Sequence, residues 1–318
     1  MSAPLPIPAP SITVMRGIAL MSFAMLMVPL MDTVAKYLTG ALPPLQITLG
    51  RFGFQMLFAF LTAAIGPGLA ALKAPRLWPH LLRGFFLSGA SACFFTALKT
   101  MPVADAIAIF FVEPMILTVL SALLLGESVG PRRWSAVFVG LIGAMIIIRP
   151  GFTAFGPTAL LPLAAAFLFA LYLVITRRLS GEGSMLSVQF SAGLGGAILL
   201  GALTAGGTMA GIEDATPVMP DLPSWGLLAI VGAISFFAHG LIVKAFAGAP
   251  ASVLAPFNYL EIVSATLFGY LVFGDFPDGP TWVGIALIVG SGIYIAHREH
   301  RLSRAEMAAR ATRTGPPD

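Results

Sequence analysis

The sequence has few charged residues. Only 10% of its 318 residues are Asp, Glu, Lys or Arg, whereas a typical soluble protein has roughly 25%. Hydrophobic residues make up 58% of the chain, and its mean hydropathy is +0.92. Apolar runs of about 20 residues, long enough to cross a bilayer, recur along most of its length. This composition excludes an ordinary soluble protein and predicts an integral membrane protein.

Cysteine and the usual catalytic motifs are also scarce. Cys93 is the only cysteine, so the sequence excludes a disulfide framework and a cysteine metal site. It contains no HExxH zinc motif, no P-loop and no Gly-x-Ser-x-Gly element, which mark zinc hydrolases, nucleotide-driven pumps and serine hydrolases. We therefore expect no metal, no cofactor and no ATP hydrolysis by this chain.

What the sequence contains is a series of apolar runs separated by Pro, Gly and charged residues. These breaks predict ten membrane helices and no soluble domain. The predicted helices span about residues 15–37, 45–65, 81–100, 103–125, 132–149, 156–177, 184–206, 223–246, 250–273 and 279–296. The first helix lacks the features of a cleavable signal peptide, so we interpret it as a span. The sequence thus predicts an all-α membrane protein.

Basic residues are distributed unevenly between the loops. If the N-terminus is cytoplasmic, the inner segments hold fourteen Lys and Arg residues and the outer segments hold three. An excess of Lys and Arg marks the cytoplasmic side. Both termini are therefore predicted inside, as an N-terminal segment, 1–14, and a basic tail, 298–318. The same distribution explains the net charge of +4 without a nucleic-acid partner.

The second half of the sequence repeats the first. A shift of 148 residues aligns ALKTMPVADAIAIFFVEPMILTVLSALLLGESVGPRRW with AFAGAPASVLAPFNYLEIVSATLFGYLVFGDFPDGPTW. The uncommon residues that coincide are Pro102 with Pro250, Glu113 with Glu261, Gly126 with Gly274, and Trp134 with Trp282. Because each copy has an odd number of helices, five, the copies must lie in the membrane with opposite orientation. Inverted repeats are characteristic of secondary transporters, whose substrate sites lie near the midplane between the repeats.

These two copies resemble the EamA-type repeats of the drug/metabolite transporter superfamily. The resemblance rests on the pair Glu113–Pro114, the turn LLGE and the Gly-rich last helix of each copy. The second copy departs from it with Ile262 in place of proline and Asp275 in place of glutamate. The resemblance covers two repeats, residues 15–149 and 156–297. It implies ten helices, a bacterial inner-membrane location and movement of small metabolites, which in this family range from amino acids and amines to vitamins, nucleotide derivatives and drugs.

Two glutamates lie at the centre of predicted helices. Glu113 is the eleventh residue of the span 103–125, and Glu261 has the same position in the second copy. Each is roughly 15 Å from its helix end, at the membrane midplane. A central acidic residue costs about 2.5 to 3.5 kcal/mol, so it should face the bundle interior. Three roles are open: binding a cationic substrate group, exchanging protons, or holding neighbouring helices by a hydrogen bond.

Prolines lie close to both glutamates. Pro114 follows Glu113, and Pro256 precedes Glu261 by five residues. Each predicts a local helix break whose freed carbonyls can line a cavity.

Asp32 and Arg51 are further charges within predicted spans. By residue count they lie about 9 and 10 Å below the outer helix ends, so they share a depth and can form an ion pair. Lys36 lies one turn after Asp32, a favourable spacing for a second pair. The alternatives for Asp32 and Arg51 are a salt bridge that joins two helices, a substrate-binding role, or an outer gate.

Several uncharged polar residues complete the candidate set. His239 is the only histidine within a predicted span, and it is either a packed hydrogen-bonding residue or part of the site. Asn258 and Tyr259 precede the second central glutamate, and an aromatic ring there can stack on a planar or cationic ligand or simply pack. Tyr172 and Gln55 are weaker candidates.

Together these features favour a secondary transporter that moves a small organic metabolite by alternating access, with proton coupling or exchange. Two central acids and no obvious central base favour a cationic or zwitterionic solute, such as an amino acid, an amine or a sulfonium compound like S-adenosylmethionine. The alternative is a vitamin or a nucleotide-sugar-like solute. The expected partners are this solute, the lipid bilayer and, in a homodimer, a second copy of the chain.

Two other function classes are weaker. A membrane-embedded hydrolase needs a nucleophile with a positioned base, and only His239 is available at depth. A structural or receptor subunit would need an interaction surface outside the bilayer, for which the basic tail is the one candidate.

Overall fold

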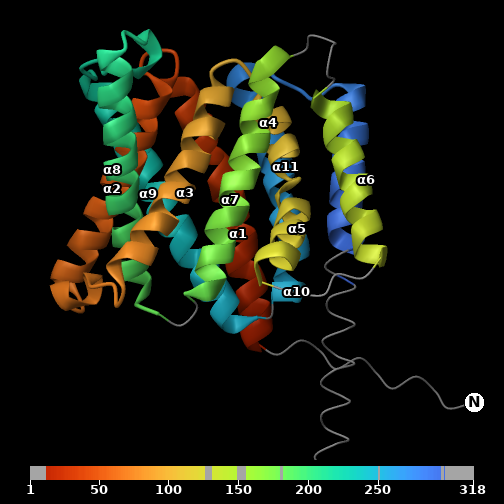
Figure 1. Cartoon of the computed structure of the whole chain (residues 1–318), viewed down its shortest axis with the longest axis horizontal. Coiled ribbons are helices and arrows are strands. Elements are labelled where there is room, and N and C mark those ends of the chain that lie inside the picture. The colour runs from red at the N-terminus through yellow and green to blue at the C-terminus, as the bar shows by residue number, and fades with distance from the viewer. Residues whose placement is uncertain are drawn as a thin grey trace, which may run out of the picture.

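The computed structural model describes residues 12–125, 131–148, 155–179, 182–249 and 251–294, together with residue 297. Throughout these ranges the regular secondary structure is helical, and Figure 1 shows the helices side by side in one bundle. The predicted all-α class is confirmed for this part of the chain. The features that lie outside it are Gly126, Pro250, the tail 298–318 and most of the N-terminal segment 1–14.

Seven helical stretches of the described residues are long and apolar enough to cross a membrane, and three shorter apolar helices accompany them. The uninterrupted long helices are α1 (Ile12–Leu38), α2 (Pro44–Ile65), α3 (Leu77–Leu98), α7 (Leu160–Arg178), α8 (Met185–Met209) and α9 (Leu222–Gly248). The seventh stretch is Val103–Leu124, and the shorter helices are Trp134–Ile148 within α6 (Pro131–Ile148), Phe257–Phe273 and Gly279–Tyr294. The 3-10 turns η1 (Leu69–Leu72), η2 (Gly156–Ala159) and η3 (Glu213–Ala215) lie between long helices.

Two spans are interrupted where the sequence predicts a break. The first consists of α4 (Val103–Phe110) and α5 (Glu113–Leu125), and the second of α10 (Ala251–Leu254), η4 (Ala255–Tyr259) and α11 (Leu260–Phe273). Pro114 lies in the first turn of α5 and has no amide hydrogen, so the carbonyl of Phe110 lacks its helical donor. The ring centroids of Phe111 and Tyr259 lie 5.3 Å apart, and the 148-residue shift makes these two residues equivalent. The two breaks therefore meet inside the bundle.

Most of the close helix packing joins the first half of the chain to the second. Helix α1 packs on α9 and α11, and α7 packs in the same manner on α3 and α5. Helix α2 packs on α8 and α9, while α8 in turn packs on α2 and α3. In the repeat, α1, α2, α3 and α5 correspond to α7, α8, α9 and α11. If each helix is exchanged for its counterpart in the other half, this set of contacts stays the same. Neither half has this packing on its own.

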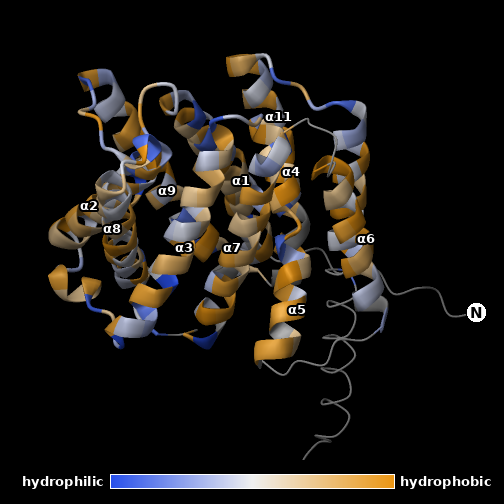
Figure 2. Ribbon diagram, turned by 45° about the horizontal axis from the view of Figure 1, so that its top comes forward, coloured by the Kyte–Doolittle hydropathy of each residue, from blue (hydrophilic) through white to orange (hydrophobic). Residues whose placement is uncertain are grey.

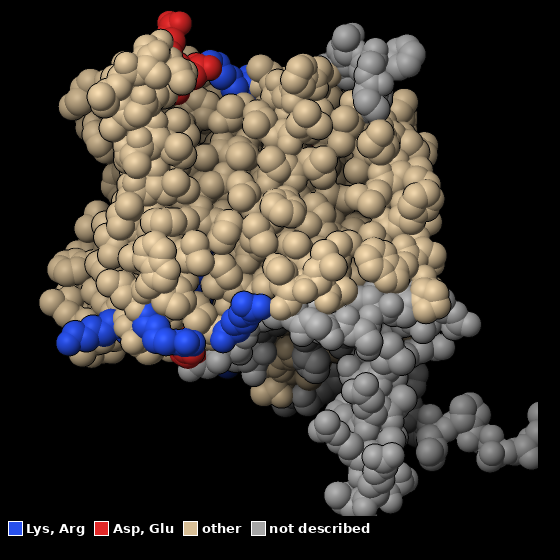
Figure 3. All heavy atoms as spheres, viewed as in Figure 1, with Lys and Arg blue, Asp and Glu red and all other residues tan. Residues whose placement is uncertain are grey.

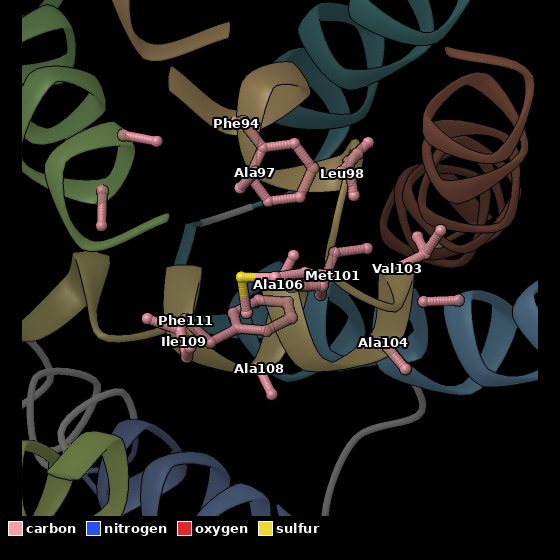
Figure 4. Packing of buried hydrophobic residues seen from close by; sticks show 14 of the residues in the cluster. Phe94, Ala97, Leu98, Met101, Val103, Ala104, Ala106, Ala108, Ile109 and Phe111 are labelled. Atoms are coloured by element: carbon pink, nitrogen blue, oxygen red, sulfur yellow. The ribbon is translucent and has the colours of Figure 1, made fainter. Parts of the chain in front are cut away.

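Helix α4 lies at the centre of the apolar packing. Its residues from Val103 to Ile109 are all buried, and Figure 4 shows Phe94 and Leu98 of α3 close to Met101, Ile109 and Phe111. Between membrane helices such contacts stabilise by van der Waals packing, because lipid is as apolar as the side chains. A close approach of α6 to the last helix also depends on glycine, since a Cβ at Gly143 would lie 2.9 Å from the carbonyl oxygen of Gly284.

Polar residues concentrate at the two ends of the bundle. Figure 2 shows hydrophobic residues along the helices and many hydrophilic residues in the connecting segments. In Figure 3 the Lys, Arg, Asp and Glu side chains visible on this face lie at its upper and lower edges, with a broad uncharged band between them. This surface fits a lipid environment around the middle of the bundle.

Candidate functional site

Glu113 is the first residue of α5, directly after the break in its span. Its side chain is half-buried, and the Oε1 atom is buried without a hydrogen-bond partner among the described residues. Tyr259 from the second break is close enough to interact with it electrostatically. The break thus exposes a carboxylate oxygen to the bundle interior, where an unsatisfied acceptor costs free energy and favours a proton or a ligand.

Glu261 lies in the first turn of α11, after the second break. Its electrostatic neighbour is Asp32 of α1, whereas the described residues show no direct contact between the Glu113 and Glu261 carboxyl groups. The geometry around Pro29 explains this placement. Pro29 lacks an amide hydrogen, and the carbonyl of Met25 that it leaves free accepts a hydrogen bond of 3.1 Å from Ser264. This bond ties α11 to α1 one turn beyond Glu261.

Asp32 and Arg51 are both buried, with exposed fractions of 4% and 6%. They interact electrostatically, but the described residues contain no direct ion pair between them. The guanidinium of Arg51 instead donates to Ser91 at 2.7 Å and to Ser235 at 3.1 Å. The two side chains are thus close enough to interact, and the predicted direct ion pair is not formed in this conformation.

Lys36 pairs with a different acid from the one expected. Its Nζ lies 2.5 Å from Asp275, in the turn after α11, and 4.6 Å from the ring centroid of Phe273. The predicted contact with Asp32 is thus replaced by an ion pair with Asp275 at one end of the bundle. That pair joins the first half of the chain to the second.

A chain of buried hydrogen bonds extends from Arg51 across the bundle. Ser235 of α9 donates to Gln55 at 2.8 Å, and Gln55 donates to Gln189 of α8 at 3.0 Å. Gln189 donates onward to the carbonyl of Phe236 at 3.1 Å. Three helices are therefore joined by side chains that keep their polar groups satisfied, as a membrane interior requires.

His239 and the two residues before Glu261 have distinct surroundings. The Nδ1 atom of His239 bonds the carbonyl of Ser235 at 2.8 Å, which fits the packed hydrogen-bonding interpretation. Asn258 has a buried Oδ1 atom without a partner in the described part of the chain. Tyr259 packs its hydroxyl against the last helix, where a Cβ at Gly292 would overlap it.

Two matches to one family model identify the family of the chain. The model of the EamA-like transporter family matches residues 15–149 and again residues 156–296. The chain belongs to the EamA-like transporter family. It is therefore a transporter and not an enzyme, and its class is that of multi-pass membrane proteins that carry small solutes.

Relatives of this EamA-like chain differ in the solute they are named for. It is 31% identical to a riboflavin transporter of Rhizobium johnstonii, over 86% of this chain and 89% of the relative. It is 28% identical to an S-adenosylmethionine uptake transporter of Rickettsia prowazekii, over 91% and 95% of the two chains. A solved structure covers 88% of this chain and 96% of its own, with 25% identity and a TM-score of 0.60.

Sequence reasoning missed several buried polar residues of this EamA-like bundle. Asp105 of α4 is buried and accepts a hydrogen bond of 2.8 Å from Thr281 of the last helix. Arg83, which we assigned to a cytoplasmic segment, is buried in α3 with an exposed fraction of 2%.

Proposed function

We propose that this EamA-like protein is a secondary transporter that moves a small zwitterionic or cationic solute across the bacterial inner membrane by alternating access. It does so as ten membrane helices in two inverted repeats, residues 15–149 and 156–297, with the segments 1–14 and 298–318 in the cytoplasm. Support comes from the family match to both halves, from the exchangeable helix contacts and from the meeting of the two helix breaks.

The observation that carries the proposal is the group of buried acids beside the breaks. Glu261 and Asp32 interact electrostatically across α11 and α1. Two acids so placed repel each other when both are ionised, so they favour a bound proton or a bound cationic group between them. Acidic residues inside a membrane are costly and mark substrate or proton pathways. Glu113, with its unpartnered oxygen, is the third acid of the site.

The solute that fits this arrangement carries both charge and a planar ring. The partly exposed ring of Tyr259, which packs on the buried Phe111 beside Glu113, provides a surface for stacking, and the acids provide the partner for a cation. S-adenosylmethionine, for which one relative is named, has an adenine ring, a sulfonium and an amino-acid group. Riboflavin, for which another relative is named, is the second candidate because its planar ring suits the same aromatic surface.

The experiment is uptake into proteoliposomes of purified protein. Labelled S-adenosylmethionine and riboflavin are supplied separately, each with and without an imposed pH gradient. We expect saturable uptake of one solute, and loss of uptake in Glu113→Gln and Glu261→Gln at unchanged insertion and folding. Glu213→Gln, a substitution on the exposed surface, is the matched control and keeps the wild-type rate. Normal uptake by both glutamine variants would remove the carboxylates from the mechanism.

A further inference from the structure

The inner third of α3 holds a buried cation without an acidic partner. Arg83 is 2% exposed, and His80, one turn before it, is fully buried. The described residues place no carboxylate within ion-pair distance of Arg83, whose electrostatic neighbour is Tyr172 of α7. Glu182, the acid that interacts electrostatically with His80, is already paired with Arg76. A guanidinium taken out of water without a counter-charge is strongly unfavourable, so this position needs a balancing anion.

The hydrogen bond between these two residues leaves donors unused. Arg83 donates from a terminal nitrogen to the Nδ1 atom of His80 at 3.0 Å. Since an arginine only donates, Nδ1 must accept, and the proton of the neutral ring then lies on Nε2. Both this Nε2 and the Nε atom of Arg83 are buried without a partner among the described residues. Two unused N–H donors next to one positive charge match the oxygens of a carboxylate or phosphate.

The position of the pair connects it to the acids already described. His80, Arg83, Leu87 and Ser91 follow a spacing that places them on one face of α3, and Ser91 accepts a hydrogen bond from Arg51. Arg83 lies about 12 Å from Ser91 along the helix. Tyr172 interacts electrostatically with both arginines. Asp32, in turn, is an electrostatic neighbour of Arg51.

We propose that Arg83 and His80 form an anion-binding subsite for the carboxylate or phosphate of the transported solute. The solute then carries an anionic group, which binds at Arg83. This proposal rests on the proposed transport function for the identity of the solute. It adds a buried base near one end of α3 to the two central acids predicted from the sequence.

The test is binding to purified protein in dodecyl maltoside micelles without added lipid, so that no headgroup phosphate supplies the anion. The probes are S-adenosylmethionine, its decarboxylated form and sulfate. We expect S-adenosylmethionine to raise the unfolding temperature more than the decarboxylated form does. In Arg83→Met that difference disappears, and S-adenosylmethionine binds about tenfold to a hundredfold more weakly, as for the loss of a charged hydrogen bond.

A second measurement needs no ligand. Without probe, Arg83→Met should unfold at a higher temperature than the wild type, because an apolar side chain replaces an unbalanced buried charge. A lower unfolding temperature would show a structural role and would overturn the proposal. Arg83→Lys keeps the charge and loses the Nε donor, so it tests binding even if the methionine variant fails to fold. Lys99→Gln removes an exposed cation at the other end of the same helix and should leave probe binding unchanged.

The subsite and the transport function fail in different ways. An equal response of wild type and Arg83→Met to every anionic probe, including no response in either, overturns the subsite. If the wild type binds the probes through Arg83 but proteoliposomes move no solute, the subsite stands and the transport function falls. If uptake is saturable and Arg83→Met leaves it unchanged, transport stands and the subsite falls.

Discussion

The two helix breaks occupy equivalent positions in the repeat but have different surroundings. At the first break Glu113 follows a two-residue turn and has an unpartnered carboxylate oxygen in the described part of the chain. At the second, Glu261 follows a 3-10 helix and has Asp32 as its charged neighbour. The duplication therefore retained the acid and changed its partners. We infer that Glu261 acts together with Asp32, and that Glu113 acts alone.

The largest expected effect comes from the acids themselves. If Glu261 and Asp32 share one proton or cation, then Glu261→Gln, Asp32→Asn and the double variant should all lose uptake to a similar degree, since the pair fails as a unit. In the double variant that carries Glu113→Gln and Asp32→Asn, the fold-decrease in uptake rate should instead be the product of the fold-decreases in the two single variants. Initial uptake rates in proteoliposomes measure both cycles. If the losses from Glu261→Gln and Asp32→Asn also multiply in their double variant, the two residues act independently and the inferred difference between the breaks is wrong.

A smaller effect concerns the aromatic residue before the second glutamate. In the repeat alignment Phe111 corresponds to Tyr259, and Ala144 corresponds to Gly292. The second half therefore has the larger aromatic side chain, and it has a glycine where the first half has an alanine. Gly292→Ala should destabilise the protein by about 1 to 3 kcal/mol through overpacking against the tyrosine hydroxyl. Thermal unfolding measures the loss.

The matched control for that substitution is Gly290→Ala, because a Cβ at Gly290 meets no atom within 4 Å. Tyr259→Phe should restore the stability of the Gly292→Ala variant by removing the overlapping hydroxyl. If it does not restore stability, the close contact is not the cause.

The hydrogen bond of α11 to α1 is expected to contribute less. Ser264 bonds the carbonyl that Pro29 frees, and its counterpart in the first half is Ile116, which has no hydroxyl. Ser264→Ala should cost about 0.6 kcal/mol, the average for such bonds between membrane helices. Ser291→Ala is the control, because Ser291 bonds a carbonyl of its own helix. Equal losses in thermal unfolding would show that the link between helices contributes nothing specific.

The smallest effect is expected at the ion pair between Arg76 and Glu182, which lies in the segments that connect the helices. The Arg76 side chain, as hydrogen-bond donor and positive charge, lowers the pKa of Glu182 below its ordinary value. A lowered pKa means that the carboxylate stabilises the fold above the ordinary pKa of glutamate, and that this contribution disappears as the pH falls through the lowered one. Glu182→Gln should thus reduce the unfolding temperature slightly at neutral pH and not at all in strong acid. If the variant and the wild type still differ in unfolding temperature in strong acid, the ion pair is not the cause of the difference.

The sequence predicted much of the bundle and less of its polar interior. Periodic apolar runs and prolines gave the helices and both breaks, because these depend on local chemistry such as the missing amide of Pro114. The partner of Lys36 could not be predicted, since Asp275 is distant in sequence and no local rule favours it over Asp32. Arg83 was misplaced for a related reason: a basic residue near a helix start is normally cytoplasmic, and only packing against α7 and α8 buries it.

The exchange of partners between the halves has a consequence for the order of assembly. Helix α1 finds its main neighbours, α9 and α11, only near the C-terminal end of the chain. Its polar residues therefore enter the bilayer long before Arg51, Ser264 and Glu261 can all surround them. During synthesis Arg51 of α2 is the first charged partner that Asp32 can meet, while α9 and α11 arrive much later, so the first helix inserted is among the last to reach its final packing.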